Sequence, residues 1–144
     1  AVGDERKGFA RTYLVKDKIS GELAGYFSLR TGLITIQAAG DQFDTFPAAE
    51  LSNFAVNQRY KQEHPQVMSL GKYMFRSFII PLVVRMARYI GMYALYIYAL
   101  PEEKLIEHYK KLGFSRLPPA QEQFVQRHVK PKYDEGCVFM YQTL

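Results

Sequence analysis

The sequence lacks several features that would mark common classes of protein. Its 144 residues include a single cysteine, Cys137, so an intrachain disulfide is excluded. The three histidines, His64, His108 and His128, do not have the spacing of metal ligands, and we expect no bound metal. Low cysteine usage is typical of a reducing compartment, and on this basis we expect a cytoplasmic protein.

Membrane and nucleotide-hydrolase signals are also missing. The most apolar window, residues 73–90, contains three arginines and a proline, which a lipid-buried helix would tolerate only at high cost. The first ten residues have no apolar signal region. Neither the GxSxG motif of a hydrolase nor the GxxxxGKS/T motif of a P-loop occurs. We therefore expect no membrane association and neither of these two chemistries.

The composition is that of a folded protein with a sizeable core. Hydrophobic residues make up 48% of the chain and include 11 tyrosines and 10 phenylalanines. Together with the length, this predicts one domain over residues 1–144. The net charge of +5 suits an anionic partner such as a nucleotide cofactor or RNA, and ordinary surface charge is the alternative explanation.

Short apolar runs bounded by turn residues predict six strands in an open, mixed α/β sheet. They cover residues 11–16, 23–30, 50–56, 92–100, 114–117 and 136–144. The run LITI after Gly32 either continues the second strand past a bulge or forms a short extension. Residues 38–47 are expected to be a polar loop, and residues 57–66 are polar and interrupted by Pro65. One or two helical turns are expected after Pro119.

Two helices are predicted between the later strands. From Ser69 to Ile90, apolar residues recur at three- and four-residue spacing, which indicates a helix that ends at Gly91 and is kinked at Pro81. The next strand is almost entirely apolar and is expected to be a buried parallel strand, which completes a βαβ unit. Pro101 suits the first position of a second helix, which Gly113 then stops. The order is β-β-β-α-β-α-β-β.

The segment before the long helix has the character of a phosphate-binding loop. A loop that enters a helix presents unpaired backbone N–H groups, and small residues allow an anion to approach them. Ser69 is also a good N-cap, provided that its φ is negative. A plain capped helix start is the alternative. The residues concerned are Gln66, Val67, Met68, Ser69, Leu70, Gly71 and Lys72.

Over residues 11–144 the element order and two motifs resemble the GNAT N-acetyltransferase family. The loop matches the family's cofactor-binding pattern at Gln66 and Gly71, with Ser69 in place of the middle glycine. The resemblance assigns residues 66–72 to the pyrophosphate of acetyl-CoA, although Lys61 could occupy the basic position instead. It also assigns the backbone of one strand segment to the pantetheine arm, namely Phe54, Ala55 and Val56.

The second motif is HYKKLGF, residues 108–114, at the end of the predicted second helix. In the family a tyrosine at this place protonates the CoA thiolate, and the resemblance therefore implies that Tyr109 is a catalytic acid. The alternative is a half-buried core tyrosine whose hydroxyl is bonded to backbone. His108 points about 100° away on a helix and is expected to be a surface residue. The family often has Asn seven residues before the tyrosine, where this sequence has Glu102.

Glu50 lies on the same strand as the predicted pantetheine contacts, where family members use a carboxylate as a general base. The resemblance implies that Glu50 takes a proton from the acceptor, directly or through water. A solvated charge at the start of a strand is the alternative.

The resemblance implies the acyl-CoA N-acyltransferase fold and transfer of an acetyl group from acetyl-CoA to a primary amine. A toxin of this type that acetylates aminoacyl-tRNA is one alternative, which the basic residues of the C-terminal third permit. A non-catalytic CoA- or protein-binding domain is another. The family's first strand and two helices, one wall of the acceptor site, are not found before residue 11. A fragment, a short member, or a wall supplied by a partner such as a second copy would each explain this.

Overall fold

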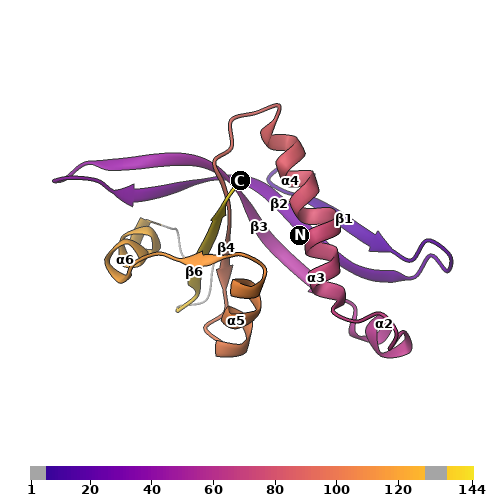
Figure 1. Ribbon diagram of the computed structural model, residues 1–144. Coiled ribbons are helices and arrows are strands. Elements are labelled where there is room, and N and C mark those ends of the chain that lie inside the picture. The colour runs from indigo at the N-terminus through magenta and orange to yellow at the C-terminus, as the bar shows by residue number, and fades with distance from the viewer. Residues whose placement is uncertain (1–5, 129–135) are drawn as a thin grey trace.

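The computed structural model describes residues 6–128 and 136–144, which form a mixed α/β fold around one six-stranded sheet (Figure 1). The strands are β1 (Arg11–Lys16), β2 (Leu23–Gln37), β3 (Phe43–Val56), β4 (Ala94–Ala99), β5 (Ser115–Arg116) and β6 (Val138–Thr143). The helices are α2 (Gln58–Glu63), α3 (Leu70–Met74), the π-helix η1 (Phe75–Ile79), α4 (Ile80–Ala87), α5 (Glu103–Lys111) and α6 (Pro119–His128).

The strand order is β1-β2-β3-β4-β6-β5, in which β3 and β4 are parallel and the other neighbours antiparallel. The sheet is thus mixed and mostly antiparallel, and the predicted open, mixed α/β sheet with its βαβ unit is confirmed. β4 is buried along most of its length, as its apolar sequence predicted. None of the helices in the described part of the chain has the length and apolarity that a membrane crossing requires.

The hairpin of β2 and β3 is longer than predicted and projects beyond the rest of the sheet (Figure 1). β2 runs unbroken through Gly32, and its register shift lies between Ser28 and Leu29 instead. Residues 43–47 pair with β2, so the predicted loop over residues 38–47 is wrong. The phenylalanines and the threonine within residues 43–47 favour a strand. Only residues 38–42 turn the chain.

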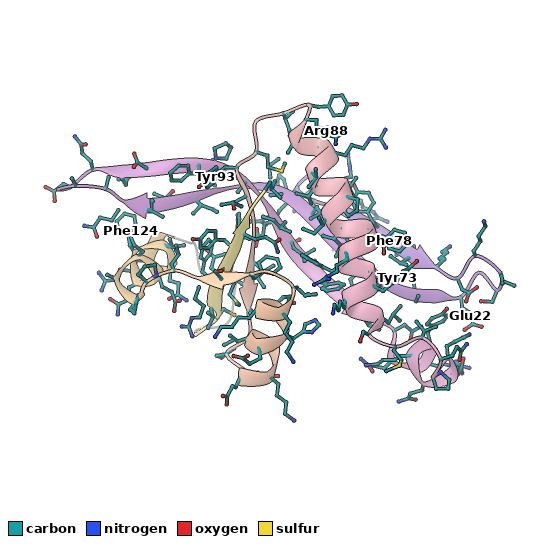
Figure 2. All side chains as sticks on the ribbon, in the orientation of Figure 1. Glu22, Tyr73, Phe78, Arg88, Tyr93 and Phe124 are labelled. Carbon is teal, nitrogen blue, oxygen red and sulfur yellow. The ribbon has the colours of Figure 1, made fainter. Side chains whose placement is uncertain are left out.

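One helical segment, residues 70–87, consists of α3, η1 and α4 in succession. Pro81 has no N–H and would collide with the carbonyl four residues before it in a regular helix. The preceding turn is widened, so that the N–H of Ile80 donates to the carbonyl of Phe75. The predicted kink at Pro81 thus takes the form of a π turn. On the outer face of this segment Tyr73 and Phe78 meet edge to face, 5.9 Å between ring centroids (Figure 2).

The long helix ends earlier than predicted, at Ala87. Arg88 is the C-cap, and its N–H donates to the carbonyl of Arg85 at 3.2 Å, an i→i−3 hydrogen bond of the kind that tightens a helix end. Gly91 therefore lies beyond the helix and is not its C′ residue.

The start of α5 also differs from the prediction. Its first residue is Glu103, and Glu102 is the N-cap with an extended backbone. Pro101 therefore precedes the cap and does not occupy the first helical position. The reason is a tight turn, in which the N–H of Glu102 donates to the carbonyl of Leu100 at 2.7 Å.

Helix α2 lies within the polar stretch 57–66, for which no helix was predicted. Its N-cap is Asn57, whose side-chain oxygen accepts a hydrogen bond from the N–H of Arg59 at 3.1 Å. The buried Tyr60 fixes this short helix to the β1–β2 turn, because its hydroxyl donates to the carboxylate of Asp17 at 2.6 Å. This contact holds the pKa of Asp17 at about 2, with help from the backbone N–H groups of Ser20 and Ile19.

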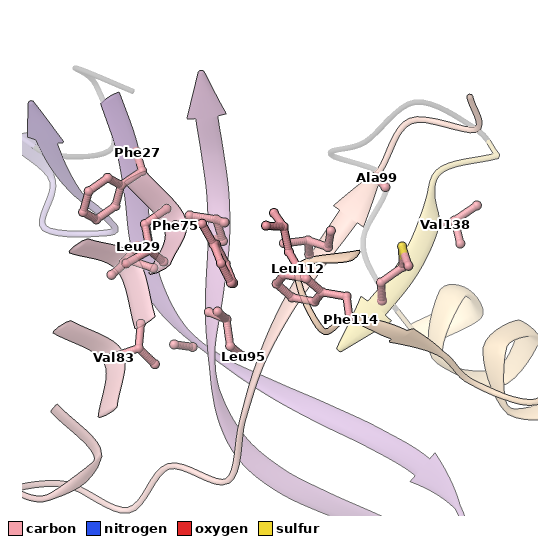
Figure 3. Close-up of a cluster of buried hydrophobic side chains, with 14 residues drawn as sticks. Phe27, Leu29, Phe75, Val83, Leu95, Ala99, Leu112, Phe114 and Val138 are labelled. Atoms are coloured by element: carbon pink, nitrogen blue, oxygen red, sulfur yellow. The ribbon is translucent and has the colours of Figure 1, made fainter. Parts of the chain in front are cut away.

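The helices cover the two faces of the sheet unequally. The main core joins the α3–α4 segment and α5 to one face through residues such as Phe75, Val83 and Phe114 (Figure 3). On β3 and β4 the side chains that alternate with this set face the other way and form a second cluster with Val125 of α6. Both α3 and α5 therefore reach the central strands from the same side.

Candidate active site

The parallel strands β3 and β4 separate in the middle of the sheet. Their pairing spans Ala48–Glu50 of β3 and Ala94–Tyr96 of β4 and stops there. Beyond it β3 continues to Val56, and β4 continues to Ala99 with β6 on its other side. Figure 1 shows the two strands diverging, with α3 close to the end of β3 and α5 close to β4. A split of this kind leaves strand edges whose backbone groups can bond an extended ligand.

The predicted pantetheine contacts lie on this edge of β3. Phe54, Ala55 and Val56 are half-buried and pair with β2 on their other side. They lie beyond the point of separation, which begins at Leu51. Their position is therefore compatible with strand-like bonding to a ligand.

Gly71, in the first turn of α3, is the point where three elements meet. A side-chain carbon built on Gly71 would lie 3.6 Å from Val56 Cγ2 and 3.9 Å from both Phe54 Cζ and His108 Nε2. These are ordinary contact distances, so an alanine would fit, and the backbone of Gly71 does not require glycine. The glycine thus keeps open a small space between α3, the end of β3 and α5.

Ser69 has φ 53° and ψ 48°, a left-handed conformation that is uncommon for residues other than glycine. Ser69 is the N-cap residue of α3, but its φ is positive and its side chain makes no capping hydrogen bond, so the condition set for a serine cap is not met. The reason is the left-handed backbone, which turns the side chain away from the first helical N–H groups. A left-handed residue followed by a helical one directs neighbouring N–H groups toward one point, an arrangement that binds anions.

The remaining loop residues differ in their surroundings. Gln66, Met68 and Lys72 are exposed. Val67 is half-buried against the cluster that contains Tyr60, and Leu70 is itself buried in that cluster. The side chains of Val67 and Leu70 therefore hold the loop in place, and only their backbone is available to a ligand.

Tyr109 is half-buried on α5, and its ring meets the edge of Phe114 with the centroids 5.7 Å apart. The helix stop fixes this geometry: the N–H of Phe114 donates to the carbonyl of Tyr109, and the left-handed Gly113 donates to Lys110. Burial raises the pKa of Tyr109 above its ordinary value of about 10. Among the described residues its hydroxyl has no hydrogen-bond partner, whereas the core-tyrosine alternative required one from the backbone. The neutral hydroxyl is thus available to donate a proton.

His108 is half-buried, so its prediction as a surface residue is wrong. The expectation that His108 points away from Tyr109 is also wrong, because the two rings lie side by side with their centroids 5.6 Å apart. Gly71 and the end of β3 lie close to His108 as well. Burial lowers the pKa of His108, and the charges of Lys111 and Lys61 lower it further. Only its adjacency to Tyr109 in the sequence could have indicated a place in the site.

Glu50 lies at the last β3–β4 pair and is buried, with 1% of its surface exposed. It accepts a salt bridge from Arg30 Nε at 2.7 Å, so the solvated-charge alternative is wrong. Burial and then the charge of Glu50 raise the pKa of the neighbouring Tyr96, which also bonds Glu50. Because Glu50 and Ala49 alternate on β3, Glu50 faces away from the core that contacts Tyr109. The two residues thus lie on opposite faces of the sheet.

Within the described residues, no three His, Cys, Asp or Glu side chains gather as a metal site. The candidate site therefore combines four groups at the separation of β3 and β4. They are the start of α3, which can bind an anion, the open edge of β3, the neutral hydroxyl of Tyr109 and the buried carboxylate of Glu50.

Comparison with known proteins gives a structural match. No protein-family model matches the sequence, and no curated protein matches it. A tyrosine-to-phenylalanine mutant of the toxin AtaT, bound to the C-terminus of the antitoxin AtaR and acetyl-CoA, has a TM-score of 0.63 and 19% identity over 99% of this chain and 72% of that chain.

Two further solved structures also match the fold of this chain. AtaT complexed with acetyl-methionyl-tRNAfMet has a TM-score of 0.65 and 16% identity over 99% of this chain and 75% of that one. A tyrosine-to-phenylalanine mutant of KacT has a TM-score of 0.67 and 18% identity over 98% of this chain and 75% of that one. At these identities the likeness concerns the fold.

Proposed function

The chain has the fold of GNAT acetyltransferases, and we propose that it transfers an acetyl group from acetyl-CoA to an amine. The observation that supports this best is the convergence at the β3–β4 separation. There the start of α3, the open edge of β3 and the Tyr109 helix border the same space around Gly71.

In the proposed complex the cofactor lies across these elements in sequence. Its pyrophosphate binds the backbone N–H groups at the left-handed turn of Ser69 and the first turn of α3, with residues 66–72 forming the loop. Its pantetheine arm follows the edge of β3 at Phe54, Ala55 and Val56. The thioester then reaches the separation of the strands near Tyr109.

The reaction proposed is direct attack by a neutral acceptor amine on the thioester carbonyl. The new C–N bond forms, the C–S bond breaks, and the CoA thiolate takes the proton of the Tyr109 hydroxyl. A phenol whose pKa is raised above 10 is fully protonated near neutral pH and can serve as this acid. We propose that Glu50, on the opposite face, takes the proton lost by the amine, directly or through water.

Replacement of Gly71 by alanine tests the cofactor site, because it adds one methyl group to the open space without straining the fold. We expect the free energy of unfolding to be unchanged or up to about 1 kcal/mol higher, since alanine favours a helix. The affinity for acetyl-CoA should fall by about tenfold or more, equivalent to about 1.4 kcal/mol. Denaturant unfolding and isothermal titration calorimetry measure the two quantities.

Gly91→Ala is the matched control, because an added carbon there meets nothing within 4 Å and its φ is not positive. It should bind acetyl-CoA like the wild-type chain. Unchanged affinity in Gly71→Ala would contradict the proposed site, and a wild-type chain that does not bind acetyl-CoA would contradict the proposed function.

For the acceptor we propose the amino group of an aminoacyl-tRNA. The AtaT structure with acetyl-methionyl-tRNAfMet supports this, as does the net charge of +5. In the basic C-terminal third, Arg127 is exposed, Arg116 is paired with Glu122, and positions 130 and 132 lie outside the described residues.

With acetyl-CoA present, we expect release of CoA with aminoacylated tRNA and none with deacylated tRNA. Binding of the tRNA should weaken steeply between about 50 and 200 mM salt, as phosphate contacts do. A panel of small primary amines is the control. Turnover on small amines alone would contradict the tRNA acceptor, and cofactor binding without any turnover would favour the non-catalytic alternative.

A further inference from the structure

We propose that the outer edge of β1 binds an extended acidic peptide of a partner protein, which adds a strand to the sheet beside the helical segment 70–87. The binding surface is the edge groove, a hollow between β1 and that helical segment. This inference does not depend on the proposed acetyl transfer, because neither residues 54–56 and 66–72 nor Tyr109 line the edge groove.

β1 is the terminal strand of the sheet, since among the described residues it pairs with β2 alone. In such a strand every second backbone N–H and C=O points away from the one neighbouring strand, where water or an added strand can bond it. The six residues of β1 extend over about 20 Å. A peptide segment of the same length can therefore continue the sheet by strand addition.

The edge groove follows this strand closely. Its wider part has a volume of about 450 Å³ and is lined by the consecutive residues 13–16 of β1 and by Phe78 and Leu82 of the helical segment. Because successive side chains of a strand point to opposite faces, contact with four residues in a row places the groove at the edge of β1 and not over one face. A second part of about 190 Å³ shares Tyr13 and continues toward residues 8–11.

The walls of the edge groove suit the alternating side chains of an added strand. Tyr13, Val15 and Leu82 pack against the main core and form an apolar wall for every second side chain of a peptide. Phe78, which is 41% exposed, lies on the side of the helical segment toward β1 (Figure 2). The wider part alone is within the range of about 300–1,000 Å³ that is usual for ligand clefts.

The charge of this edge favours an acidic partner. Five of the residues 6–18 are basic, and the acidic one, Asp17, is bonded to the hydroxyl of Tyr60. Arg11 and Lys16, at the two ends of β1, each line one part of the edge groove, and no acidic side chain of the described residues lines either part. A second copy of the chain fits poorly, because antiparallel pairing of two β1 strands brings Arg11 opposite Lys16. An acidic peptide compensates these charges.

Fluorescence anisotropy with a labelled peptide of the length of β1, in which valine alternates with glutamate, tests the inference. We expect a Kd of about 10–100 µM, and binding at least about tenfold weaker when lysine replaces glutamate. Two further peptides carry N-methyl groups on the valines or on the glutamates. Because the valines fix which face meets the helical segment, only one set of N–H groups can bond β1. One N-methylated peptide should therefore lose binding and the other should keep it.

Protein variants locate the binding surface. Lys16→Glu should weaken binding about tenfold, with Lys104→Glu on α5 as the control of unchanged affinity. Phe78→Ser should also weaken binding about tenfold, and Val84→Ser is its matched control, because Val84 is exposed on the helical segment but does not line the edge groove. Acetyl-CoA should leave peptide binding unchanged.

Three results would overturn the inference. They are a Kd above about 1 mM for the acidic peptide, equal effects of the two N-methylations, and binding of a single-stranded RNA of like charge in place of the peptide. Each of them leaves the proposed acetyl transfer as it stands, because that proposal is tested by acetyl-CoA binding and CoA release.

Discussion

Tyr109→Phe is expected to lower kcat by roughly 10²–10⁴-fold, because the CoA thiolate then leaves without its proton donor. The affinity for acetyl-CoA should change little, since the ring and its contact with Phe114 are retained. Stability should change by less than about 0.5 kcal/mol, because the hydroxyl has no hydrogen-bond partner within the described residues. Thiol release, calorimetry and denaturant unfolding measure these three quantities on the same protein.

Tyr141→Phe is a suitable control, because Tyr141 is another half-buried tyrosine but packs in the second cluster, against Phe139. It should retain full activity. The raised pKa of Tyr109 also predicts that the wild-type rate does not decline through loss of this acid below about pH 10. A Tyr109→Phe enzyme with wild-type kcat would show that the thiolate is protonated by another group or by water.

The parts of the fold that followed from the sequence have strong local signals. The apolar run of β4 and the helix stop at Gly113 are determined by burial and by a left-handed glycine, which the residues themselves specify. The first half of β3 was missed because its strand character depends on pairing with β2, which is not visible in residues 43–47 alone. Helix α2 was missed because it is short and depends on the distant contact of Tyr60 with Asp17.

The same distinction holds for the candidate site. The motif at residues 108–114 predicts the catalytic role of Tyr109, which stays a prediction, and it indicated nothing about the place of His108 beside Gly71. That residue is brought to Gly71 by the packing of α5 near the end of β3. The left-handed backbone of Ser69 could not be predicted, because serine favours an N-cap with negative φ and only the loop geometry imposes the opposite. The burial of Glu50 likewise depends on Arg30 and Tyr96 from neighbouring strands.

Glu50→Gln is expected to reduce the free energy of unfolding by about 2–3 kcal/mol. Removing one partner of a fully buried ion pair costs about 3–5 kcal/mol, and the smaller figure applies because the Arg30 side chain is 27% exposed and can still reach water. Denaturant unfolding of Glu50→Gln, Arg30→Met and the double variant gives the coupling between the two residues. The peripheral pair is the control: Glu122→Gln, opposite Arg116, should cost less than about 1 kcal/mol.

The kinetic consequence separates a structural role from a catalytic one. If Glu50 only holds the strands together at their point of separation, Glu50→Gln and Arg30→Met should both lose stability and keep kcat wherever they are folded. If Glu50 also takes the amine proton, kcat should fall by about 10²-fold or more in Glu50→Gln alone, and the acidic limb of its pH–rate profile should disappear. Since Gln retains the shape of the side chain, loss of activity with the fold intact would assign the effect to the carboxylate. An unchanged kcat would leave Tyr109 as the one protein group that moves a proton in the proposed reaction.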